Sequence, residues 1–271
     1  MREALAFLTP FGGAASPTPR AMRWFPVVGI LIGGVLGLVW WLADEWWLPL
    51  VAGAIVVVFD LGFTNLLHLD GLADSADGLL PPLGTPARRL EVMADPTTGA
   101  FGVGMVAAVL ILRFAAFTQA APVLNSDFPL TGNWDGLSQG WLAMPLTLAG
   151  IWGVSRTTMA AGALALPYMR EGGLAAAFLP DRSIVDGGGA QVRNDSGPPW
   201  ALVAGGATAG ALAATGAGWR GLVAVVLCAL GAAAVFALAH RRIGGFTGDV
   251  LGAAGMIGET VALLALSFRI T

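Results

Sequence analysis

Long apolar segments alternate with short polar ones along almost the whole chain. Seven of these segments approach or exceed the roughly 17–25 residues that a tilted helix needs to cross about 30 Å of hydrocarbon. They are Val27–Ala43, Trp47–Phe63, Phe101–Ala121, Trp141–Leu166, Trp200–Ala217, Gly221–Ala239 and Val250–Phe268. The pattern predicts an all-α, polytopic membrane helix bundle of about seven transmembrane helices, with residues 1–271 forming a single membrane-embedded domain.

Composition agrees with this reading. Hydrophobic residues make up 56% of the chain, charged residues make up 11%, and the mean hydropathy is +0.75. A soluble protein carries roughly 45–50% apolar and about 25% charged residues, so a soluble helical core is disfavoured. The net charge of −3 argues against nucleic-acid binding, which needs a basic face. Cys228 is the single cysteine, which excludes a disulfide framework and favours a packing role for it.

Arginine placement predicts the orientation of the bundle. The chain has no lysine. With seven spans, one side of the membrane receives ten arginines, and the opposite side receives Arg220 and Arg269. The ten are Arg2, Arg20, Arg23, Arg88, Arg89, Arg170, Arg182, Arg193, Arg241 and Arg242. By the positive-inside rule, the N-terminus and the polar loops at 64–100, 167–199 and 240–249 are expected in the cytoplasm.

The first of these loops carries a cluster of acids. Asp70, Asp74 and Asp77 are spaced i, i+4 and i+7, which places all three on one face of a helix. Like charges this close repel each other unless a cation lies among them. Mg²⁺ binds through a few carboxylates and keeps waters that a substrate phosphate can displace, so the cluster predicts a magnesium site. The alternative is a solvated face of an amphipathic helix.

The last polar loop combines basic residues with glycines. Arg241 and Arg242 are followed by Gly244-Gly245, Thr247 and Asp249. Arginine forks and exposed backbone N–H groups both bind phosphate oxygens, although two arginines by themselves are an ordinary membrane anchor. Together with the acids, they favour phosphoryl transfer. Because the chain lacks lysine and a Gly-x-x-x-x-Gly-Lys loop, the reaction would start from a preformed diphosphate or phosphodiester at the membrane face.

Ionisable residues also fall inside predicted spans, among them Asp60, Arg113 and Arg156. Asp60 is expected either near the cytoplasmic interface or facing a cavity or a partner. Arg113 and Arg156 are near enough to span ends that snorkelling is a plausible explanation for either. His68, beside the acids, is expected to support or pack against the site more than to bind metal.

The motifs resemble those of the cobalamin synthase family, also called adenosylcobinamide-GDP ribazoletransferases. The segment 68–78 is similar to the family signature, and 88–95 with 99–102 resembles its second block. The segment 155–159 with 170–174 resembles a third block, and 241–252 resembles the last. Several blocks in the same order cover most of the chain. The family usually has Ser-Arg where Pro96-Thr97 stand, and a basic residue where Ala94 stands. We therefore expect this loop to lack a phosphate-contacting arginine, for which one of five others would compensate: Arg88, Arg89, Arg156, Arg241 or Arg242.

The resemblance implies an integral membrane transferase that uses Mg²⁺. It implies transfer from adenosylcobinamide-GDP to α-ribazole or its 5′-phosphate, with GMP released, at the cytoplasmic face of a cell (inner) membrane. We expect Asp70, Asp74, Asp77 and Asp95 to hold the metal, and Asp70 or Asp249 to act as the base. The residues expected to contact substrate are His68, Arg88, Arg89, Gly99, Gly102, Arg156, Arg241, Arg242 and Thr247. The expected protein partners are further copies of this chain or other cobalamin-assembly enzymes.

Two other function classes stay open. Asp74-Ser75-Ala76-Asp77-Gly78 resembles the start of the CDP-alcohol phosphotransferase motif, but Pro81-Pro82 replace its next step and its later acids are not found. A cation transporter would use the acids as an ion site, but it would need them deep within several spans rather than clustered at one edge.

Overall fold

The computed structural model describes residues 1–13, 18–126, 140–170, 176 and 200–268. Helices account for nearly all of these residues, and within them the only β-type pairing is an isolated bridge between Tyr168 and Phe246. The helices are α1 (Arg2–Leu8), α2 (Phe25–Trp46), α3 (Pro49–Phe63), α4 (Leu67–Leu79), α5 (Pro86–Met93), α6 (Ala100–Ser126), α7 (Gly140–Ala165), α8 (Trp200–Ile243) and α9 (Gly248–Ser267), with short 3₁₀ turns at Pro10–Gly12 and Pro19–Trp24. The all-α prediction is therefore confirmed.

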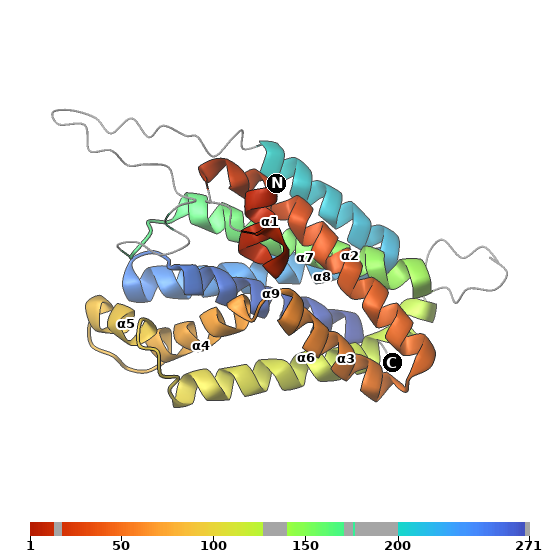
Figure 1. Ribbon diagram of the computed structural model, residues 1–271, viewed down its shortest axis with the longest axis horizontal. Helices are drawn as coiled ribbons and strands as arrows, with labels where there is room; N and C mark the ends of the chain where they lie inside the picture. The colour runs from red at the N-terminus through yellow and green to blue at the C-terminus, as the bar shows by residue number, and fades with distance from the viewer. Residues whose placement is uncertain (14–17, 127–139, 171–175, 177–199, 269–271) are drawn as a thin grey trace.

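Helix α7 lies at the centre of the bundle, between α2 and α8 (Figure 1). Gly29, Gly33 and Gly37 of α2 recur every four residues and lie directly against the α7 backbone. A Cβ at Gly37 would lie 2.5 Å from the Met144 carbonyl oxygen, so only glycine permits this approach. Close backbone contact through small residues is typical of helix packing in membranes.

Four helical segments in the described part of the chain are long and apolar enough to cross a membrane. They are Pro19–Trp46, Ala100–Ala120, Trp200–Ile243 and Gly248–Ser267. Large apolar side chains face outward on several helices, including Val58 at 69% exposure, Ile111 at 65% and Leu230 at 60%. These outward side chains fit contact with lipid, and the chain is a membrane protein. The count of seven spans and the orientation stay predictions; Arg182, Arg193 and Arg269, used for the orientation, lie outside the described residues.

Helix α8 covers the fifth and sixth expected spans. Its 44 residues would extend about 66 Å if straight, roughly twice the thickness of the hydrocarbon core. The backbone is not helical at Ala217–Gly218, where Gly218 has a positive φ, and Figure 1 shows the chain turning back here, so that both arms of α8 extend toward the left from the break. The predicted boundary between the two segments therefore coincides with a real break.

The second expected span, Trp47–Phe63, corresponds to α3, and a break in the backbone follows it. Helix α3 has only 15 residues, and α4 follows after a bend of 87°. The bend lies at Asn65 and Leu66, which both have positive φ values that non-glycine residues rarely adopt. The connection that was expected to begin at residue 64 contains helix α4, which carries the acid cluster; α3 and α4 together are long and apolar enough to form a broken span or a re-entrant segment.

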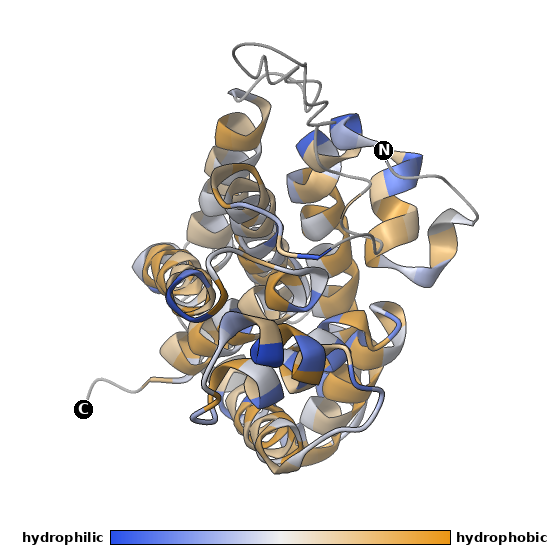
Figure 2. Cartoon of the chain, turned by 90° about the vertical axis from the view of Figure 1, so that its left-hand side faces the viewer, coloured by the Kyte–Doolittle hydropathy of each residue, from blue (hydrophilic) through white to orange (hydrophobic). Residues whose placement is uncertain are grey.

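Polar connections gather at one end of the bundle. Helices α4 and α5, the end of α8 and the turn into α9 lie toward the left of Figure 1, whereas the α2–α3 turn and the break in α8 lie toward the right. Figure 2 looks at the left end and shows hydrophilic residues gathered there, with mostly apolar helix flanks around them. This end carries the candidate site.

Candidate functional site

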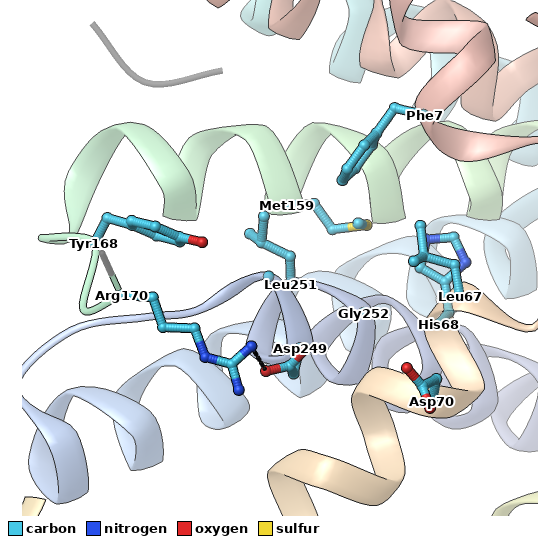
Figure 3. Close-up of a pocket in the computed structure, with 11 residues that line it drawn as sticks. Phe7, Leu67, His68, Asp70, Met159, Tyr168, Arg170, Asp249, Leu251 and Gly252 are labelled. Carbon is cyan, nitrogen blue, oxygen red and sulfur yellow. Dashed lines mark ion pairs between the residues drawn. The ribbon is translucent and has the colours of Figure 1, made fainter. Parts of the chain in front are cut away.

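A cavity of about 230 Å³ opens where α4 meets α9. It is lined by Phe7, Leu67, His68, Asp70, Met159, Tyr168, Arg170, Gly248, Asp249, Leu251 and Gly252 (Figure 3). The cavity is smaller than the roughly 300–1,000 Å³ of ordinary small-molecule sites. It is large enough for a reacting phosphate group but too small for a whole nucleotide conjugate.

Two glycines bring the acids of α4 close to the start of α9. A Cβ at Gly71 would lie 2.7 Å from the Asp249 carbonyl oxygen, and one at Gly252 would lie 3.1 Å from the His68 Cα. The two helices therefore touch through their backbones. As a result the Asp74 carboxylate lies within electrostatic reach of Asp249, Asp70 and Asp77. The predicted helical face of acids is confirmed, and α9 adds a fourth carboxylate to it.

Arg170 faces this cluster. Its Nη1 lies 3.1 Å from an Asp249 carboxylate oxygen, and its Nη2 donates a 2.7 Å hydrogen bond to the Met93 carbonyl. Two backbone hydrogen bonds, Met169 N–H to Phe246 O and Phe246 N–H to Pro167 O, fix the segment that carries it. Figure 3 shows the guanidinium directed at Asp249, below the Tyr168 ring. Burial raises the pKa of the Tyr168 phenol, so this group stays protonated at neutral pH.

Asp77 has a structural role that the sequence did not reveal. Its carboxylate accepts hydrogen bonds from the backbone N–H of Gly99 at 2.7 Å and of Gly102 at 2.9 Å, and so caps the start of α6. A Cβ at either glycine would run into this carboxylate. Gly99 and Gly102, expected to contact substrate, here bind Asp77. The expectation that Asp77 is a metal ligand stays a prediction, and both its oxygens already have partners.

Asp95 lies on the exposed loop between α5 and α6. Its carboxylate accepts hydrogen bonds from the Thr97 backbone N–H at 2.8 Å and from the Thr97 hydroxyl. These bonds hold the pKa of Asp95 below its usual range. The carboxylate thus closes a local turn and does not line the cavity with Asp70 and Asp249.

The arginines expected at the substrate differ widely in placement. Arg88 is exposed and pairs with Glu91 at 2.8 Å. Arg89 is buried, and its guanidinium donates to carbonyls at the end of α4 and in the turn that follows, and so holds this turn in place. The acceptors are Gly78, Leu79, Pro81 and Leu83. Arg241 and Arg242 are exposed at the end of α8, and Arg242 lies near enough to lower the pKa of Arg89, which burial already lowers.

Thr247 is fully buried at the N-cap of α9. Its hydroxyl accepts from the Val250 N–H at 3.4 Å and donates to Asp249 at 3.2 Å. Thr247 therefore starts the helix and orients Asp249, which is a different role from the substrate contact that was expected.

A chain of ion pairs crosses the interior beneath the cavity. Arg113 Nη2 lies 2.5 Å from Asp60, and its Nη1 lies 3.1 Å from Glu259. Glu259 also pairs with Arg156 and accepts a 2.9 Å hydrogen bond from Ser155. All four charged side chains are at most 4% exposed. Snorkelling is therefore the wrong explanation for Arg113 and Arg156, and Asp60 has a partner.

His68 lies between the cavity and these ion pairs. It lines the cavity, is only 3% exposed, and lies within electrostatic reach of Arg156 and Glu259. Arg156, expected at the substrate, does not line this cavity, and its Nη1 is occupied by Glu259. Within the part of the chain that the structure describes, the Arg156 Nε and Nη2 and the His68 Nε2 have no hydrogen-bond partner.

The residues suit a magnesium ion only if a ligand completes its coordination. Nowhere in the described ranges do three or more Asp, Glu, His or Cys side chains converge closely enough to hold a metal. Mg²⁺ is usually held by one or two carboxylates together with waters and substrate phosphates, and does not need an all-protein cage. Asp70 and Asp249 line one cavity, with Asp74 in electrostatic reach, and so satisfy this requirement.

Sequence reasoning missed several functional candidates. Arg170 and Tyr168 line the cavity but were not among the expected substrate contacts. Arg170 begins one of the family-like blocks, which was a usable signal. Glu259 joins the two buried arginines, and its signal was an acid inside a predicted span, as for Asp60.

Comparison with known proteins identifies the family. The sequence model of the family described as cobalamin-5-phosphate synthase matches residues 1–267. An adenosylcobinamide-GDP ribazoletransferase of Ectopseudomonas mendocina (strain ymp) is 34% identical, over 99% of this chain and 98% of that protein. Proteins of the same name from Pseudomonas aeruginosa (strain UCBPP-PA14) and Roseiflexus sp. (strain RS-1) are 34% and 33% identical, over 97% and 98% of this chain and 96% and 88% of those proteins. No solved structure gives a significant match. The chain belongs to the cobalamin-5-phosphate synthase family.

Proposed function

We propose that this protein transfers the adenosylcobinamide phosphoryl group from adenosylcobinamide-GDP to α-ribazole or its 5′-phosphate and releases GMP. Full-length similarity to ribazoletransferases supports the reaction. The observation that carries the site assignment is the cavity where Asp70, Asp249 and Arg170 meet, because it joins carboxylates with a cation that binds phosphate.

The chemistry needs three things from the chain. Asp74, together with either Asp70 or Asp249, would hold Mg²⁺, which when bound would offset the negative charge of the diphosphate. A carboxylate not engaged with metal, Asp70 or Asp249, accepts the proton of the ribazole 5′-hydroxyl as the new O–P bond forms. The bond from that phosphorus to the GMP oxygen breaks, and arginines offset the charge on the departing GMP.

The small cavity places limits on how the donor lies. About 230 Å³ can hold the reacting phosphates but not the corrin ring or the guanosine. We infer that both of these lie outside the cavity, above the polar end of the bundle. Arg241 and Arg242 are exposed at this end and are positioned to meet phosphate or ribose groups there.

We further propose that the protein is a multi-pass protein of the cell (inner) membrane with this polar end in the cytoplasm. The arginine bias supports this orientation. Water-soluble substrates carrying phosphates would then reach the site without crossing the bilayer.

One assay tests the proposal against its alternatives. Purified protein in detergent, given Mg²⁺, adenosylcobinamide-GDP and α-ribazole, should release GMP in step with product. Release of CMP from a CDP-linked lipid, or cation flux in liposomes, without GMP would overturn it. The buried ion pairs weigh against a transporter, because the deep acids Asp60 and Glu259 are already neutralised by Arg113 and Arg156.

A further inference from the structure

We propose that Arg170 is a resident counter-ion of the acid site, which gives way when a divalent cation enters and then binds the diphosphate of the donor. This rests on the proposed function and adds to it the residue that couples metal entry to donor binding. The Arg170 guanidinium pairs with one of these carboxylates, Asp249, at 3.1 Å.

The charges around Arg170 explain why it lies there. Asp70, Asp74 and Asp249 gather where α4 touches α9, and their mutual repulsion is unfavourable without a cation. Arg170 is the cationic side chain that the described residues bring within electrostatic reach of both Asp74 and Asp249. Because the same carboxylate cannot fully serve a guanidinium and a metal ion, the two compete.

Because the backbone at Arg170 is fixed, a movement of its side chain alone is enough to change its partner. Its backbone is held by the paired segments at 167–169 and 246, whereas its side chain is 28% exposed at the cavity. Among the described residues, the side chain has two polar contacts, to the Asp249 carboxylate and to the Met93 carbonyl. Rotation of the side chain alone would turn the guanidinium from Asp249 into the cavity, where its fork matches phosphate oxygens.

This role predicts opposite effects on two ligands. In the absence of nucleotide, Arg170→Met should bind Mn²⁺, a spectroscopic substitute for Mg²⁺, about tenfold more tightly than wild type, or about 1.4 kcal/mol. At saturating Mn²⁺ the same variant should bind GDP, which carries the donor's diphosphate, about tenfold more weakly. A merely structural role for Arg170 would weaken both.

Electron paramagnetic resonance measures free Mn²⁺, and fluorescence competition measures GDP. Arg220→Met is the matched control, because it removes the same charge at a position far from the site. Arg220 follows the break in α8, at the opposite end of the bundle, and donates to the Phe268 carbonyl. Arg170→Gln, which removes the charge but keeps a donor for Met93, covers the case in which Arg170→Met fails to fold.

Equal or weaker Mn²⁺ binding by both Arg170 variants, or no detectable binding by any of the proteins, overturns the inference. Undiminished GDP binding also overturns it. Failure of the wild type to release GMP would instead count against the proposed function, so the two can be told apart.

Discussion

Replacing Glu259 by glutamine should destabilise the protein more than any change at an exposed ion pair. Glu259 is 2% exposed and accepts from Arg113, Arg156 and Ser155. With Asp60 it balances the two arginines, so the four charges sum to zero. Glutamine keeps the shape but leaves one uncompensated positive charge in the interior of the bundle.

The size of the effect follows from this imbalance. Breaking a buried ion pair by removing one partner costs about 3–5 kcal/mol, mostly because the remaining charge stays buried. Since whole proteins are stable by only about 5–15 kcal/mol, this loss is a large fraction of the total. At roughly 2–4 °C for each kcal/mol, Tm should fall by at least about 6 °C.

Thermal unfolding in detergent, followed by intrinsic tryptophan fluorescence, measures the change. Glu91→Gln is the control, because Glu91 pairs with Arg88 on an exposed helix face, where such pairs contribute about 0–1 kcal/mol. Adding Arg113→Met to Glu259→Gln restores charge balance and should recover part of the lost Tm. If Glu259→Gln lowers Tm no more than Glu91→Gln does, the buried charges are not what holds these helices together.

Three further outcomes are expected. Asp74→Asn should lower turnover at least about a hundredfold while leaving Tm nearly unchanged. Asp77→Asn should lower turnover and also lose about 1 kcal/mol of stability, because it weakens the cap on Gly99 and Gly102. Equal Tm values for the two variants in calorimetry would contradict this. Arg89→Met should leave four carbonyls without their donor and should speed amide exchange at residues 79–83. Unchanged hydrogen–deuterium exchange at these residues would contradict the structural role of Arg89. Chelation by EDTA should abolish GMP release, and Mg²⁺ should restore it; full activity after chelation would remove the metal from the proposed function.

Local patterns predicted the helices well, because they depend on neighbours within one segment. The spacing of Asp70, Asp74 and Asp77 placed three acids on one helical face, and α4 has that face. The α3–α4 bend was missed because it lies at Asn65 and Leu66, and neither is a glycine or a proline, the residues that usually mark a bend. Their strained backbone is set by packing around the break, which a single sequence does not show.

Contacts between distant segments were harder to predict. Gly71 and Gly252 look like ordinary small residues, yet they set the approach of α4 to α9 and thereby bring Asp249 to the acids. Arg113 and Arg156 were each read against their own span ends, where snorkelling is reasonable. Their common partner Glu259 lies more than one hundred residues further along the chain, so neither span revealed the pairing.

The departures from the family pattern gain a physical explanation from Arg170. Ala94 stands where a basic residue is usual, and five arginines were expected to compensate: Arg88, Arg89, Arg156, Arg241 and Arg242. Arg88 pairs on an exposed face, and Arg89 and Arg156 are buried. Arg170 instead donates to the carbonyl of Met93, directly before Ala94, and so brings a guanidinium to the place where the sequence lacks one. If this is compensation, Ala94→Arg should restore part of the GDP affinity that Arg170→Met loses, while Ala87→Arg, on the exposed first turn of α5, should not.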